Sequence, residues 1–277
     1  MAISNFIPTI WSENLYNALN NKYVAVANCN REFEGEIRQK GAVVKICGVG
    51  EIAIGDYTKD TDMSNPQSLS DTVAELTIDQ AKYFNFQIDD IDKAQCTPRL
   101  MDAAMSRAAD GLANEADKYV FGLYDRLDNV VTKEGVDATN ILDAIIEARE
   151  LLYGGNVSDT SEIVIEVSPA IASLILKAKI DLSSDNTAAL ENGCIGSIGG
   201  CKVFVSNNVA QEAIATTNFH KCFVRTKRAI AFAEQLSEID AYRPEKRFAD
   251  AVKGLHLYGA GIIYPSEIVL MNLGVEI

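Results

Sequence analysis

The sequence has few of the side chains from which metal centres and hydrolytic active sites are built. Its two histidines, His220 and His256, are far apart in the chain, and no two cysteines form a C-x-x-C pair. The six cysteines are Cys29, Cys47, Cys96, Cys194, Cys201 and Cys222. Zinc sites need soft ligands at close spacing, so we expect no metal, no cofactor, and reduced thiols as in a cytosolic protein. We identify no catalytic, cofactor-binding or metal-binding residue.

Long apolar runs and positive charge are scarce as well. No run approaches the roughly 18 uninterrupted apolar residues of a membrane-spanning helix. The start, MAISNFIPTIW, has no basic region and is interrupted by Pro8, so it is not a signal peptide. Lys and Arg total 25 against 39 Asp and Glu, a net charge of −14. Such a surface repels phosphate, so we expect no dedicated nucleic-acid-binding site. Without a long apolar run, we expect a soluble protein with no membrane partner.

Apolar residues recur at helical spacing from Thr97 to Leu127, and the rest of the chain is organised around this stretch. The repeating positions are Leu100, Ala104, Ala108, Leu112, Ala116 and Val120. Thr97 is a favourable N-cap and Pro98 suits the first helical position, while Gly111 and Gly122 are weak points. About 30 residues at 1.5 Å each make a rod of roughly 45 Å. By itself, such a helix also suits the core of an ordinary enzyme.

The N-terminal part of the chain predicts an arm and a long hairpin. Residues 1–34 are rich in large apolar side chains, which must dock on their own domain or on a neighbour. Residues 42–47 and 51–54 have the composition of strands, and the polar, aperiodic residues 55–75 follow them. A structureless loop of about 20 residues usually has a function. We therefore expect a hairpin that projects from the body.

Two further patterns lie within this loop and directly after it. Three acidic residues, Asp56, Asp60 and Asp62, lack the glycine and the closing glutamate of an EF-hand, so we do not expect a calcium site. The return strand is clearer, because alternate residues point to opposite faces of a strand. One face carries Phe84, Phe86 and Ile88, and the other carries Tyr83, Asn85, Gln87 and Asp89.

Residues 136–225 predict a mixed α/β unit, because strands and helices alternate there. An amphipathic helix over 140–153 has Asn140 as a plausible N-cap, and Pro169 begins a second helix after a strand at 161–167.

The same unit contains the most glycine-rich stretch of the chain. The glycines at 193–200 invite comparison with a phosphate-binding loop, but they lack the G-x-G-x-x-G spacing and the G-K-[ST] ending. A strand at 202–206 follows them where a helix should begin. A β-hairpin with glycine turns therefore fits better.

The last third returns to β structure. Pro265 marks a break before a final strand, Ile268–Asn272, and His256 alternates with apolar neighbours. We expect His256 to be a half-buried strand residue rather than a base. Four basic residues predict a small positive island in this acidic chain: Lys221, Arg225, Lys227 and Arg228.

Several stretches, in this order, resemble the major capsid proteins of tailed phages, which have the HK97-like fold. They are LTIDQAKYFNFQIDDIDKAQ, GCIGSIGGCKVFVSNNV and RAIAFAEQLSEIDAYRPEKRFADAVKGLHLYGAGIIYP. The resemblance implies an α+β fold with an N-arm, an extended E-loop hairpin, a P domain with a long spine helix, and an α/β A domain. The implied parts are an N-terminal arm at 1–34, an E-loop at 35–76, a P domain with the spine helix at 77–135, an A domain at 136–240, and return strands of the P domain at 241–277.

The resemblance also implies a function without enzymatic chemistry. Such proteins assemble through pentamers and hexamers into an icosahedral shell around double-stranded phage DNA, in the bacterial host cytoplasm. Implied partners are further copies of the chain, a portal protein, and packaged DNA contacted non-specifically. The chain begins directly at the arm, with no long helical leader that could serve as a fused scaffolding segment. We therefore expect a separate scaffolding protein. Some relatives form Lys–Asn crosslinks, and Lys59 would be the donor, but no partner asparagine or activating glutamate can be assigned. The alternatives are an encapsulin-like compartment shell and a cytosolic α/β enzyme with a phosphate-binding glycine loop.

Overall fold

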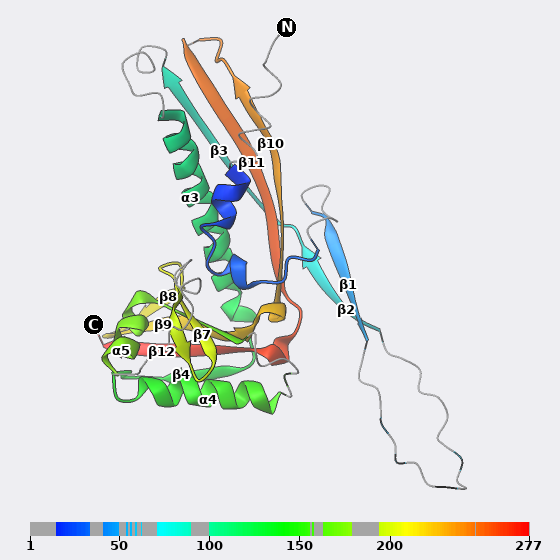
Figure 1. Cartoon of the computed structure of the whole chain (residues 1–277), viewed down its shortest axis with the longest axis vertical. Coiled ribbons are helices and arrows are strands. Elements are labelled where there is room, and N and C mark those ends of the chain that lie inside the picture. Colours follow the sequence, from blue (N-terminus) through cyan, green and yellow to red (C-terminus); the bar gives the residue numbers. More distant parts are fainter. Residues whose placement is uncertain are drawn as a thin grey trace.

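The computed structural model describes residues 15–33, 41–49, 54, 56, 59, 62, 71–89, 100–155, 157, 163–178, 194–246 and 248–276. Three parts are distinct in Figure 1. A long helix lies alongside a sheet of three long strands, a seven-stranded sheet with two helices lies at one end of them, and a two-stranded hairpin stands off to the side.

The long helix α3 (Leu100–Phe121) confirms the helical period predicted from the sequence. Its buried side chains are Met105, Ala109, Leu112, Ala113, Ala116, Val120 and Phe121. The α-helix ends at Phe121, short of the predicted Leu127, because the chain tightens at Gly122 into the 3-10 helix η4 (Gly122–Arg126). Its 22 residues make a rod of about 33 Å rather than 45 Å. The predicted cap at Thr97 and Pro98 lies outside the described residues.

The three long strands form an antiparallel sheet in the order β10 (Ile230–Tyr242), β11 (Ala249–Ile262), β3 (Gln80–Asp89). The alternation predicted for β3 is confirmed: Phe84 and Phe86 pack on the main core, while Tyr83 is 78% exposed. A side chain at Gly254 on β11 would collide with the ring of Phe84 at 2.5 Å, so this glycine makes room for the aromatic layer.

The other large sheet belongs to an α/β unit, as the alternation of strands and helices over 136–225 predicted, but two of its strands lie outside that range. Its order is β4-β12-β9-β5-β7-β6, with β8 paired to β9. The strands are β4 (Val130–Lys133), β5 (Ile163–Val167), β6 (Cys194–Ile198), β7 (Cys201–Val205), β8 (Gln211–Ile214), β9 (Thr217–Thr226) and β12 (Ile268–Glu276). The final strand thus extends beyond the predicted end at Asn272. The β4–β12 and β5–β7 pairs are parallel, and the other pairs are antiparallel.

The helices of this unit begin differently from each other. Helix α5 (Pro169–Lys177) starts as predicted, because the hydroxyl of Ser168 accepts the Ile171 N–H and Pro169 takes the first turn. Asn140 stands at the N-cap position of α4 (Ile141–Gly154), but its side chain makes no capping hydrogen bond to that helix. Its Oδ1 accepts the Asp137 N–H at 2.8 Å instead, so the predicted capping role of Asn140 is wrong.

Strands β1 (Val43–Val49) and β2 (Asp71–Thr77) form an antiparallel hairpin, as predicted, but the predicted return strand at 83–89 pairs with β11 instead of β1. Of the predicted strand at 51–54, residues 51–53 lie outside the described residues and Ile54 is not in a strand. Residues 71–75, assigned to the loop from their polar composition, belong to β2, because their backbone pairs with β1 regardless of side-chain polarity. In the two larger sheets, strand β10 belongs to the three-stranded sheet and strand β12 to the seven-stranded sheet. The division of the chain into arm, E-loop, P domain and A domain stays a prediction.

Candidate assembly surfaces and the seat of the N-terminal arm

The glycine-rich stretch is a hairpin rather than a phosphate-binding loop. Strands β6 and β7 pair antiparallel across Gly199 and Gly200, whose φ angles of +55° and +87° suit a tight hairpin turn. Arg149 on α4 donates to the Gly199 carbonyl at 2.9 Å and fills the space beside the turn. No helix follows the turn to present N–H groups to a phosphate, so the interpretation as a nucleotide-binding enzyme loses its basis.

Among the described residues, no group of His, Cys, Asp and Glu is placed to hold a metal ion. Asp56, Lys59 and Asp62 of the hairpin loop are exposed, and Asp60 lies outside the described residues. The described helices include none that is long and apolar enough to cross a membrane.

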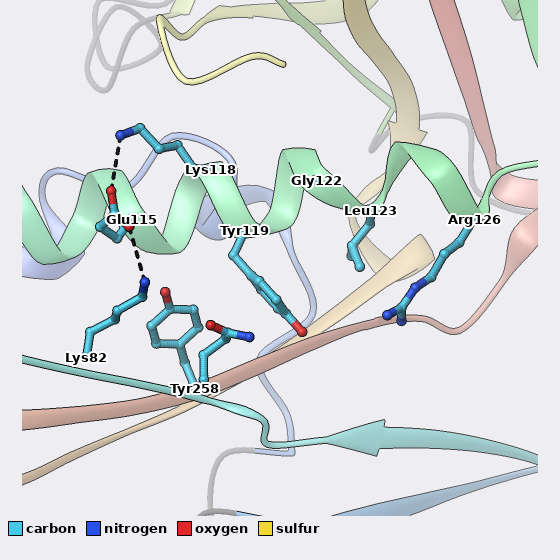
Figure 2. Close-up of a pocket in the computed structure, with 9 residues that line it drawn as sticks. Lys82, Glu115, Lys118, Tyr119, Gly122, Leu123, Arg126 and Tyr258 are labelled. Carbon is cyan, nitrogen blue, oxygen red and sulfur yellow. Dashed lines mark hydrogen bonds and ion pairs between the residues drawn. The ribbon is translucent and has the colours of Figure 1, made fainter. Parts of the chain in front are cut away.

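A pocket of about 330 Å³ lies beside the end of α3 (Figure 2). It is lined by Gln80, Lys82, Glu115, Lys118, Tyr119, Gly122, Leu123, Arg126 and Tyr258. The Nζ atoms of Lys118 and Lys82 lie 3.1 and 3.5 Å from the two carboxylate oxygens of Glu115, and the hydrogen bond from Lys118 leads the lowering of the pKa of Glu115. The three cations of this pocket, Lys82, Lys118 and Arg126, outnumber its one carboxylate, so the pocket does not suit a metal ion.

The N-terminal arm docks on its own subunit through residues 15–33. Leu15, Leu19 and Tyr23 are fully buried in the main core, and the Asn30 backbone pairs with Ile230 and Phe232 of β10. The choice between self-docking and docking on a neighbour, left open by the sequence, is thus settled for these residues. Residues 1–14 lie outside the described part.

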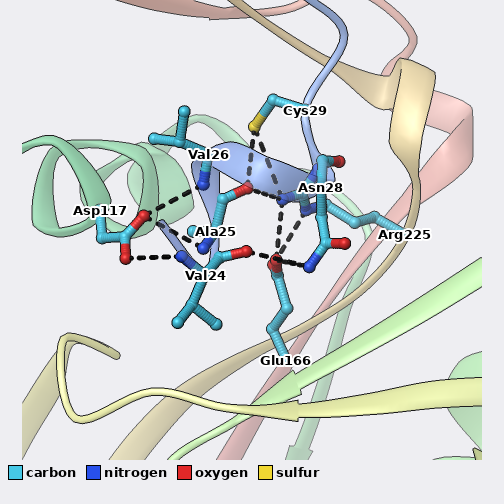
Figure 3. A network of polar contacts seen from close by, with 8 residues as sticks. All are labelled: Val24, Ala25, Val26, Asn28, Cys29, Asp117, Glu166 and Arg225. Carbon is cyan, nitrogen blue, oxygen red and sulfur yellow. Dashed lines mark hydrogen bonds and ion pairs between the residues drawn. The ribbon is translucent and has the colours of Figure 1, made fainter. Parts of the chain in front are cut away.

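A buried aspartate on α3 holds the middle of the arm (Figure 3). The Asp117 carboxylate accepts the backbone N–H groups of Val24, Ala25 and Val26 at 3.0–3.1 Å. These N–H groups precede or begin the 3-10 helix η2 (Val26–Asn28), where no backbone acceptor is available within the helix. Burial raises the pKa of Asp117 to about 6, against the lowering effect of the three hydrogen bonds.

A buried ion pair fixes the other side of the same turn (Figure 3). Arg225 on β9 and Glu166 on β5 are both 0% exposed, and the Arg225 Nε and Nη2 atoms each lie 2.9 Å from a Glu166 oxygen. Arg225 also donates to the carbonyls of Asn28 and Ala25 at 2.7 and 3.0 Å. Removing one member of such a pair leaves a buried charge without compensation. The sheet is thus joined to the arm by charge-assisted bonds.

A third buried carboxylate, Glu234 on β10, joins Tyr23 and Arg31 of the arm to β11. It accepts hydrogen bonds from the Tyr23 hydroxyl at 2.5 Å, Arg31 at 2.5 Å and His256 Nε2 at 2.8 Å. Burial works to raise the pKa of Glu234, but the bonds from His256 and Tyr23 and the charge of Arg31 outweigh it, so this pKa lies below its ordinary value. Sequence reasoning did not single out this carboxylate.

His256 is completely buried rather than half-buried as predicted. Its ring lies on the face of β11 that carries Tyr258, with ring centroids 4.9 Å apart. Its Nε2 contacts Glu234, whereas its Nδ1 is buried without a hydrogen-bond partner among the described residues. His220 lies on β9 in the other sheet, where burial lowers its pKa.

The predicted positive island does not form a surface patch. Arg225 forms the buried ion pair with Glu166, and Lys221 is 8% exposed with its Nζ 3.0 Å from a Glu212 carboxylate oxygen. Arg228 forms an ion pair with Glu267. Three of the four basic residues are thus paired with carboxylates of the same chain, and the fourth, Lys227, is half-buried.

Two regions of the described surface are suited to contact other proteins. Helix α4 is the first, because it exposes three large apolar side chains, Ile146 by 57%, Leu151 by 48% and Tyr153 by 42%. The hairpin β1–β2 is the second region, because it extends away from both sheets (Figure 1).

Comparison with solved structures places this architecture among phage capsids. A chain of Mycobacterium phage Che8 matches with 27% sequence identity and a TM-score of 0.70, over 90% of both chains. A capsid chain of Ralstonia phage GP4 matches at 11% identity and a TM-score of 0.65, over 93% of this chain and 90% of the other. A virus-like particle from Pyrococcus furiosus matches at 11% identity and a TM-score of 0.55, over 94% and 96%. No protein-family model and no curated protein sequence matches the chain.

The spine helix beside long strands, the mixed sheet and the projecting hairpin, together with these matches, define the HK97-like fold of phage capsid proteins. The α+β fold class expected from the sequence is confirmed, and the fold is that of structural shell proteins rather than of an enzyme family.

Proposed function

We propose that the protein is a major capsid protein of a tailed phage, which assembles through pentamers and hexamers into an icosahedral shell around double-stranded DNA. The observation that carries this proposal is the match over nine tenths of the chain to a phage structure at a TM-score of 0.70. A capsid of a cyanophage and a mature capsid of bacteriophage PhiM1 match with TM-scores of 0.62 and 0.60, which supports the same fold.

The geometry of the subunit supports assembly into closed rings. Near the base of the β1–β2 hairpin, Val44, Leu76 and Ile78 pack on β10 and β11, and beyond this base the described strands extend away from the body. A projecting element that meets a different surface on the next copy makes a head-to-tail contact, and such contacts close into rings when the rotation permits. The body that carries the hairpin is stiffened by the large core between α3, the arm and both sheets.

The charge of the chain supports a shell that holds DNA without binding it tightly. A net charge of −14 disfavours strong phosphate contacts, so packaged DNA would meet the wall non-specifically. We further propose assembly in the host cytoplasm with a separate scaffolding protein, and a portal protein at one vertex, as expected for capsids of this fold.

The contents of particles from the native source test this proposal. We expect nuclease-resistant double-stranded DNA of uniform length inside particles built mainly from this chain. Particles that hold a protein cargo and no DNA would instead indicate a compartment shell. That alternative is supported by the match to the virus-like particle from Pyrococcus furiosus, although its TM-score of 0.55 is below that of the phage chain.

A further inference from the structure

The base of the hairpin lies against β11 with almost no space between the two backbones. A Cβ atom built on Gly259 would lie 2.2 Å from the carbonyl oxygen of Thr77 and 3.0 Å from the Cα of Ile78. Those two residues are the end of β2 and the start of its short link to β3. Both contacts are to backbone atoms, which cannot rotate away as the end of a side chain can, so the hairpin can occupy this position only if residue 259 has no side chain.

The next glycine on the same face of β11 differs in this respect. A Cβ on Gly261 would lie 3.5 Å from the Glu75 carbonyl oxygen and 3.5 Å from Leu76 Cδ1, which is ordinary van der Waals contact. Neither Gly259 nor Gly261 has a positive φ, so alanine suits the backbone at both positions. The two glycines therefore differ mainly in the closeness of the hairpin.

The hairpin is joined to the body by a small core of its own, separate from the main core. Its buried members are Val44, Leu76, Ile78, Ala231, Ala233 and Leu257. The link after β2 is also attached to the spine helix, since the Tyr119 hydroxyl donates to Asp79 Oδ1 at 2.8 Å. The contact at Gly259, the small core and this hydrogen bond are thus the described contacts that fix the direction of the hairpin.

We propose that Gly259 is a positioning residue that sets the direction in which the hairpin leaves the body and, through it, the curvature at which neighbouring subunits join. The second half of this proposal rests on the proposed shell function. A methyl group at position 259 pushes the Thr77–Ile78 backbone away from β11, which opens the small core and tilts the hairpin. Because β1 and β2 each have seven residues, a tilt at Thr77 moves the other ends of these strands, Val49 and Asp71, further than it moves the base.

The test compares Gly259→Ala with the matched control Gly261→Ala in the full chain. Hydrogen exchange is measured on unassembled protein, with β5, β9 and β12 as the internal reference for the fold. Overpacked sites relax at the expense of local stability, so we expect exchange in β1 and β2 of Gly259→Ala to be about tenfold faster or more, and that of Gly261→Ala to stay near wild type. Equal exchange rates in β1 and β2 of the two variants overturn the proposal. The proposal is also overturned if Gly259→Ala accelerates exchange in the seven-stranded sheet as much as in β1 and β2.

Electron microscopy of assembled particles tests the link to curvature. We expect Gly259→Ala to give particles of altered diameter or open sheets, and Gly261→Ala to give particles of wild-type diameter. Wild-type diameters for Gly259→Ala overturn the link to curvature while leaving the shell function intact. If the wild-type chain forms no closed particles even when the proposed scaffolding protein is supplied, the shell function fails, whereas hydrogen exchange still decides whether Gly259 seats the hairpin.

Discussion

Replacing Asp117 with alanine should release the N-terminal arm. The change removes the acceptor of three buried backbone N–H groups, those of Val24, Ala25 and Val26. A buried donor without a partner costs about 1–3 kcal/mol, and the arm can relax to hydrate part of the set, so we expect a loss of about 3 kcal/mol in unfolding free energy. Asp117→Asn keeps an acceptor oxygen but turns an amide towards one of the N–H groups, so we expect an intermediate loss of about 1–2 kcal/mol.

Asp110 provides the matched control for this prediction. It lies on the same helix and also contacts the arm, with an oxygen 2.6 Å from Lys22 Nζ, but its side chain is 51% exposed. Exposed ion pairs contribute little, so Asp110→Ala should cost less than about 1 kcal/mol. Urea unfolding of unassembled protein measures the free energies, and limited proteolysis within residues 15–33 reports arm release. Equal losses for Asp117→Ala and Asp110→Ala would refute the account of the arm.

Three further changes test other parts of the account. Arg225→Ala should cost about 3–5 kcal/mol in urea unfolding because it strands Glu166, whereas replacing both residues with methionine should recover part of that loss; a worse double variant would speak against the buried-charge argument. The pKa of Glu234 is lowered in the fold, so its contribution is present above the unfolded value of 4.5 and is lost as pH falls through the folded value. Glu234→Gln should therefore flatten the acid side of the stability profile, and an unchanged profile would contradict this. Denaturing gels of mature particles should show an unchanged monomer band, and a ladder abolished by Lys59→Ala would establish the crosslink instead.

Local signals in the sequence predicted much of the architecture. The four-residue repeat from Leu100 to Val120 identified the spine helix, because a packed helix must place apolar residues on one face. Alternation around Phe84 identified β3, and Ser168 with Pro169 marked the start of α5. These predictions succeeded because each depends on residues a few positions apart.

The arrangement of the arm could not be predicted, because its partners are distant in the sequence. Tyr23 and Glu234 are 211 positions apart, and Arg225 lies 197 positions from Asn28. Arg225 looked like part of a surface island, since sequence spacing does not reveal that a carboxylate on the neighbouring strand β5 faces it. The backbone contact at Gly259 was equally hidden, because a glycine in a strand does not indicate which segment crosses it.

Electron microscopy of the purified wild-type chain, with size-exclusion chromatography before it, tests the central claim most directly. The account predicts that, once the proposed scaffolding protein is supplied, the chain forms closed hollow particles in which the β1–β2 hairpin of one subunit lies on the next. A chain that elutes as a single 30.1 kDa species and forms no closed particles under any assembly condition would contradict it.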